Sequence, residues 1–149
     1  MTQTNLTFQF IGGDDSVNYT RTILVENVMK SSFCSDMIEA FGSVPEDGFT
    51  ITCMNKIPVV LHEVIVDNII NILNFLNTPN GLDFIDNTHV VSVDYSNDEF
   101  DKIIGNNINC VAHMLSILSF MNINSAHKYI CNIIGKHIKM KHSDKLKQS

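Results

Sequence analysis

The longest run of helical periodicity in the chain covers residues 109–138, a segment without proline. Its first half places apolar side chains at the i, i+3, i+4 and i+7 spacing of one buried helical face: Val111, Met114, Leu115, Leu118 and Met121. Short polar side chains then interrupt the pattern up to Ser125, and a second apolar set follows: Ala126, Tyr129, Ile130, Ile133, Ile134 and Ile138. The pattern therefore predicts two helices joined by a tight turn. Such a pair cannot cover both of its apolar stripes alone, so we expect the rest to pack on the domain or on a partner.

In the N-terminal part of the chain, apolar and polar residues alternate in the way typical of strands. Residues 6–10 alternate with a period of two and stop at the glycine and aspartate cluster 12–15, which predicts a strand followed by a turn. The β-branched residues between positions 17 and 25 predict the return strand of a hairpin.

A helical pattern follows the predicted hairpin. Ser31 and Ser32 precede its apolar positions, and we expect them to cap a helix that ends at Gly42. Residues 45–48, Pro-Glu-Asp-Gly, predict a turn. Apolar residues alternate with threonines in residues 49–53, which predicts a third strand.

Helical patterns dominate the chain after the predicted third strand. Pro58 stands just ahead of a helical pattern in residues 60–76, which the sequence Thr-Pro-Asn-Gly at 78–81 breaks. The chain up to Glu99 is then short and mixed, with residues 90–93 compatible with a brief strand, and residues 100–104 indicate a short helix. Because strands come early and helices late, the sequence predicts an α+β fold.

Composition limits the classes of protein to be considered. A chain of 149 residues fits one domain, with 44% hydrophobic and 17% charged residues. The formal net charge of −6 argues against nucleic-acid binding, and five of the ten basic residues lie in the last fourteen positions. Without a signal-peptide pattern or a membrane-length apolar run, we expect a soluble protein of the cytoplasm, the nucleus or both, without a membrane partner.

Two pairs of cysteine and histidine could supply the ligands of a tetrahedral zinc ion. Cys110 and His113 lie at i, i+3, and His127 and Cys131 at i, i+4. Both pairs lie on apolar helices, where small thiols and partly buried imidazoles are common. The interpretation that we favour is therefore that these two cysteines, with Cys34 and Cys53, are reduced and mostly buried, and that no metal is bound.

Sequence motifs of catalysis are also missing. Gly12 and Gly13 lack the rest of a phosphate-binding pattern, and the chain contains neither GxSxG nor HExxH. We therefore expect no enzyme, no cofactor and no small-molecule substrate. Methionines and aromatic residues are frequent at adaptable interfaces, and the apolar stripe of residues 109–138 exceeds what one core needs, so we expect part of it to be interface.

Several ordered motifs resemble one known family. Residues 25–42, VENVMKSSFCSDMIEAFG, are similar without a gap to a stretch in which a return strand ends in a Val-Glu-like pair, a serine opens a helix, and Met-Leu-Glu leads to a glycine. Residues 6–14 resemble the strand and Asp-Gly-type turn before it. That family is the Skp1/elongin C branch of the BTB/POZ fold.

The similarity continues downstream and covers roughly residues 5–138. Residues 49–53 and 58–61 fit the third strand of that family and the Ile-Pro-Leu entry into its next helix. Residues 98–100, Asp-Glu-Phe, resemble the acidic segment before the fifth helix. Residues 118–123, LSFMNI, stand where the family has Ala-Asn-Tyr/Phe-Leu-Asp-Ile/Cys, with Ser119 in place of its asparagine.

The resemblance implies a BTB/POZ fold in residues 1–138, with a small, mainly three-stranded sheet flanked by five to six helices. Residues 139–149 would form a basic, flexible C-terminal tail.

The resemblance also implies a non-catalytic adaptor that bridges a cullin scaffold and a substrate receptor, of the F-box or BC-box type, in a ubiquitin ligase. The cullin contact of the family maps onto Ser119 and Phe120. Its receptor contacts map onto the late helices: Met114, Leu118, Ile123, Tyr129, Ile130 and Ile133. The alternative is a BTB-type homo-oligomerisation module, such as a homodimer, without a role in a ligase.

Overall fold

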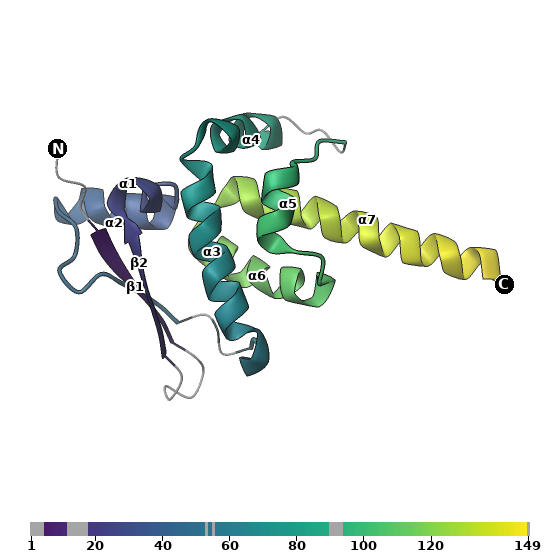
Figure 1. The fold of residues 1–149 in the computed structure, drawn as a ribbon, viewed down its shortest axis with the longest axis horizontal. Helices are drawn as coiled ribbons and strands as arrows, with labels where there is room; N and C mark the ends of the chain where they lie inside the picture. The colour runs from purple at the N-terminus through teal and green to yellow at the C-terminus, as the bar shows by residue number, and fades with distance from the viewer. Residues whose placement is uncertain (1–4, 12–17, 53, 55, 90–93, 149) are drawn as a thin grey trace.

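A small sheet and seven α-helices make up the part of the chain that the computed structural model describes, residues 5–11, 18–52, 54, 56–89 and 94–148 (Figure 1). The strands are β1 Asn5–Ile11, β2 Asn18–Leu24 and β3 Phe49–Ile51. The helices are α1 Val25–Val28, α2 Ser32–Phe41, α3 His62–Leu76, α4 Pro79–His89, α5 Asp98–Ile104, α6 Ile108–Phe120 and α7 Asn124–Gln148, with a 3₁₀ turn, η1 Val59–Leu61, before α3. The predicted α+β class is confirmed, with more helices than the five to six expected.

The sheet has β1 at its centre, in the order β2-β1-β3. β1 pairs antiparallel with β2, as the hairpin prediction requires, and parallel with β3. Phe10 lies opposite Tyr19 on one side and Ile51 on the other, and both Phe10 and Ile51 are fully buried. The predicted hairpin turn at residues 12–15 and Cys53 of the predicted third strand lie outside the described residues.

α3 is the central helix of the domain. It runs between the sheet and the later helices and contacts α1, β2, α4, α5 and α6 (Figure 1). Ten of its fifteen residues are buried. The segment Val59–Leu76 is apolar and long enough to cross a membrane by length and composition, but 56% of it is buried inside the domain, as expected for a core helix.

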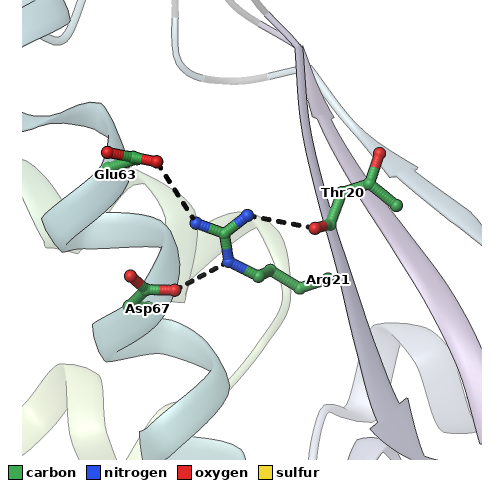
Figure 2. A network of polar contacts seen from close by, with 4 residues as sticks. All are labelled: Thr20, Arg21, Glu63 and Asp67. Carbon is green, nitrogen blue, oxygen red and sulfur yellow. Dashed lines mark hydrogen bonds and ion pairs between the residues drawn. The ribbon is translucent and has the colours of Figure 1, made fainter.

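The side chain of Arg21 connects the sheet to α3 through a hydrogen bond and ion pairs. Arg21 on β2 donates from Nε to Oδ1 of Asp67 at 2.7 Å and lies 3.9 Å from Oε1 of Glu63 (Figure 2). A second nitrogen of the guanidinium donates to the backbone oxygen of Thr20 at 3.0 Å. Because Glu63 and Asp67 are one turn apart and exposed, the network orients the strand against the helix more than it adds stability.

α4 was not predicted, since the sequence Thr78-Pro79-Asn80-Gly81 was interpreted as a break before an irregular segment. Thr78 instead accepts a hydrogen bond at its Oγ1 from the backbone of Gly81, at 3.0 Å, and Pro79 occupies the first helical position. These are the features of a helix start. The brief strand predicted at residues 90–93 lies outside the described residues.

α7 is longer than predicted. The helix continues from Asn124 to Gln148, so the segment expected to be a flexible tail is helical up to that residue. Its C-terminal half projects beyond the rest of the fold (Figure 1). Ile138, which its spacing predicts to be part of the buried stripe, is instead 61% exposed and belongs to this C-terminal half of the helix.

Two glycines with nearly the same left-handed backbone allow a matched test of the turn before β3. Gly42 ends α2 at φ 74° with open space around it, whereas Gly48 has φ 75° and a Cβ there would lie 1.8 Å from the backbone oxygen of Thr7 on β1. We expect Gly42→Ala to cost about 1–2 kcal/mol of unfolding free energy from backbone strain alone. Gly48→Ala should cost about 1–3 kcal/mol more, because β1 and the turn must separate. Urea unfolding of both variants measures the difference, and equal losses would contradict the close approach.

Candidate functional site

Ser119 and Phe120, the two predicted scaffold contacts, lie at the C-terminal end of α6. Both are exposed, and the Phe120 side chain retains 39% of its accessible surface. The ring of Phe120 packs on that of Phe33, the second residue of α2, with centroids 5.0 Å apart. The structure thus places Phe120 at the surface but anchored on one side.

A set of hydrogen bonds joins the start of α2 to the turn between α6 and α7. The hydroxyl of Ser31 donates to the backbone oxygen of Met121 at 2.6 Å and accepts from the backbone of Cys34 at 3.2 Å. The amides of Ser32 and Phe33 also donate to the turn, to Asn122 and Met121 at 3.5 and 3.3 Å. Free amides at a helix start need acceptors, and here a segment 90 residues downstream supplies them. We call these hydrogen bonds between the start of α2 and the turn after α6 the joint. It holds Phe33 beside Phe120.

An apolar groove begins on the other side of Phe33. It lies between α2 and the segment that leads into β3 and encloses about 430 Å³. Its apolar walls comprise Phe33, Met37, Phe41, Val44 and Phe49. We call it the α2 groove.

The spacing of four residues along α2 explains one wall of the α2 groove. Phe33, Met37 and Phe41 follow one another at i, i+4 and i+8, so they share one face of the helix. Phe41 is 68% exposed, which is unusual for a phenylalanine in a domain of this size. The sequence predicts that these residues belong to the helix but not that they form a surface, since only the position of the segment before β3 turns this face into a groove.

The charged side chain in the lining of the α2 groove is acidic. Glu46 lines the groove, and the neighbouring Asp47 is exposed. No lysine or arginine occurs between Ser31 and Ile51. The α2 groove therefore favours a ligand surface that combines apolar and basic side chains.

A second cavity contains two of the predicted receptor residues. It encloses about 270 Å³ between α5, the loop to α6, and α7, and is lined by Tyr129 and Ile133 together with Asp101, Asn106 and Lys136. Tyr129 is almost fully buried and Ile133 half-buried. We call it the α5–α7 pocket. α5 and α7, which contribute to its walls, lie on the side of α3 opposite to the sheet (Figure 1).

Hydrogen bonds hold the Tyr129 ring at the wall of this pocket. Its hydroxyl donates to Oδ1 of Asp101 at 2.6 Å and accepts from the backbone of Asn97 at 3.0 Å. The ring packs edge-on against Phe84 and Phe100, with centroids 5.0 and 4.9 Å away. Burial and, secondly, the bond to Asp101 raise the pKa of the Tyr129 hydroxyl well above its ordinary value.

The other four predicted receptor contacts are part of the core. Met114 and Leu118 on α6 and Ile130 on α7 have no exposed surface, and Ile123 in the turn has 1%. Their apolar faces are covered by the domain itself, chiefly by α3 and by the packing of α6 against α7. As arranged here, these four side chains cannot contact a receptor, and the expectation that the stripe exceeds the needs of one core is wrong for this part of it.

The cysteine and histidine pairs are not brought together as a metal site. Cys110 is buried, whereas Cys131 is exposed with its sulfur 3.8 Å from Nδ1 of His127. Among the described residues, no group of three or more histidine, cysteine or acidic side chains is placed to hold a metal ion. Burial raises the pKa of the Cys34 thiol to about 11, so this thiol stays protonated near neutral pH.

Comparisons with protein-family models, with curated proteins and with solved structures found no match to this chain.

The joint at Ser31 leads to a prediction about stability. Ser31→Ala removes both the helix cap and the donor to Met121 in a fully buried position, so we expect a loss of about 1–3 kcal/mol of unfolding free energy. The neighbouring, exposed Ser32 offers the control, since Ser32→Ala should change the free energy by less than about 0.5 kcal/mol. Chemical unfolding monitored by circular dichroism measures both. Similar values for the two variants would mean that the joint contributes little.

The pKa of Tyr129 predicts how stability depends on pH. Tyr129→Phe leaves the buried amide of Asn97 without its acceptor and should cost about 1–3 kcal/mol near neutral pH. A raised pKa in the folded state means that the stabilising contribution of Tyr129 is complete below the unfolded pKa of about 10 and declines as the pH rises above it. Unfolding of both proteins between pH 7 and 11 tests this. A difference that grows above pH 10 would contradict the assignment.

Proposed function

We propose that this chain is a BTB/POZ-type adaptor of the Skp1/elongin C kind, which acts by binding and bridges a cullin-type scaffold to a substrate receptor. The observation that carries the proposal is the position of Phe120, half-exposed at the end of α6 and anchored on Phe33 beside the α2 groove. An aromatic side chain that packs on the domain with one face and is exposed to solvent on the other is well suited to be an interface anchor.

The positions of the family-like motifs support this proposal. The Ser31 motif falls at the start of α2, and Gly42 ends the same helix in the left-handed conformation. The Pro58 motif falls at the entry to η1 and α3, the Asp-Glu-Phe motif opens α5, and Ser119-Phe120 ends α6. The motifs at Ser31, Pro58 and Asp98, which the resemblance expects at or just before the start of a helix, thus lie at such positions.

The separation of the two surfaces also supports a bridging role. Phe120 packs on Phe33 of α2, which also lines the α2 groove, whereas α5 and α7, whose residues line the α5–α7 pocket, lie across α3 from α2 (Figure 1). A scaffold at the first surface and a receptor helix at the second would not collide. Ile133 is the remaining receptor residue with a substantially accessible side chain, and Tyr129 forms the wall behind it.

Affinity purification of the tagged full chain from extracts of its native cells, followed by mass spectrometry, tests the proposal. The unaltered chain should recover a cullin together with box-containing receptors. Phe120→Ala should lose the cullin and retain the receptor, whereas Ile133→Ala should do the reverse. Because Phe120 is only partly buried, its truncation should cost less than the roughly 3–5 kcal/mol of a core phenylalanine.

Leu82→Ala is the matched control for this experiment. Leu82 lies on α4 with 47% of its surface exposed, similar to Phe120, but it lines neither the α2 groove nor the α5–α7 pocket. This variant should recover both partners. A wild-type chain that recovers neither cullin nor receptor, or a Phe120 variant that still recovers the cullin, would rule the proposal out.

A specific observation also favours the second candidate function, self-association as a BTB-type module. Phe41 at the end of α2 and Met29 just after α1 are 68% and 41% exposed, which leaves apolar surface on these two helices. A symmetric contact through them would give a dimer that forms in isolation and does not grow further.

A further inference from the structure

Charge is distributed unevenly along the molecule. Residues 136–148, the C-terminal half of α7, contain five of the ten basic residues and a single acidic one, Asp144. We call this segment the basic arm. α2, which forms one wall of the α2 groove, lies at the opposite end of the molecule (Figure 1), and the acidic Glu46 lines that groove. The two ends of the molecule thus carry opposite charges, basic on the arm and acidic at the α2 groove, which would attract each other between two copies.

The basic arm also carries an apolar anchor. Ile138 is 61% exposed, with the half-buried Ile134 one turn before it and the exposed Lys141 one turn after it on the same face. Met140 is 69% exposed as well. It follows Ile138 by two positions, and since each residue turns the helix by about 100°, Met140 lies on the opposite side of the helix. One face of the arm therefore presents isoleucine followed by lysine.

This face matches the α2 groove in chemistry. An amphipathic helix binds an apolar groove through anchors spaced by one turn, while charged residues pair at the rim. Ile138 would enter between Phe41 and Val44, and Lys141 would face the rim that contains Glu46. The arm of a chain cannot reach its own groove, because a continuous helix holds it at the far end.

We propose that the basic arm of one copy docks in the α2 groove of a second copy, head to tail. Such a contact is heterologous, so each copy keeps one free arm and one free groove, and the assembly grows with concentration. The inference does not rest on the adaptor function. It adds a consequence for it, since a docked arm would cover the groove next to Phe120.

Light scattering of the full chain at increasing concentration tests the proposal. The average mass should rise above 16.7 kDa without levelling off at a dimer, and salt should lower it. Ile138→Glu should weaken the association roughly tenfold or more, whereas Met140→Glu, with the same charge change on the opposite face, should have a much smaller effect. A monomer at every concentration, or equal losses in the two variants, would refute head-to-tail docking.

A mixing experiment identifies the groove as the other half of the contact. Phe41→Glu should disable the groove but keep the arm, and Ile138→Glu should do the opposite. At a concentration at which the unaltered chain has just begun to associate, each variant alone should therefore be monomeric. Their equimolar mixture should form a complex of twice the 16.7 kDa chain mass and no larger, because one functional arm meets one functional groove. A mixture that stays monomeric would overturn the proposal, and so would an Ile138→Glu variant that still forms a saturating dimer. Neither result would alter the recovery of a cullin, which is tested separately.

Discussion

The arrangement of the domain depends on how α2 obtains hydrogen-bond acceptors for its first amides. A helix start in the interior must satisfy these groups, and the local cap by Ser31 satisfies only one of them. The turn after α6 supplies the others through the carbonyl groups of Met121 and Asn122. The turn can do so because Asn122 adopts a positive φ of 53°, a conformation that asparagine tolerates better than most residues. The N-terminal and C-terminal halves are thus connected by backbone groups, and Phe33 and Phe120 meet as a result.

The sequence was informative where the signals are local. The cap at Ser31, the left-handed stop at Gly42 and the two-helix pattern beyond Asn109 depend on neighbours within a few positions, and the structure confirms all three. The start of α4 was also encoded locally, in Thr78 and Pro79, but the same residues are common in turns and were interpreted as one.

The candidate surfaces were less predictable, because exposure depends on which elements come together. Periodicity shows that Met114 and Leu118 share a face, but it does not show that the rest of the domain, including α3 and α7, buries both side chains fully. In the same way, Ile138 continues the apolar stripe of α7, yet its side chain is exposed. The C-terminal half of α7 extends beyond the globular part of the domain (Figure 1). The α2 groove could not be inferred at all from one segment, since its walls come from α2 and from the residues that lead into β3.

The length of α7 affects how the molecule moves through solution. Twenty-five helical residues span about 37 Å at 1.5 Å per residue, and roughly half of this rod extends from an otherwise globular body. The rod adds friction and a larger hydrodynamic radius without adding much mass. A single copy should therefore sediment slowly and elute early from a gel-filtration column, as a heavier sphere would. For this protein, elution volume by itself is not a measure of how many copies travel together.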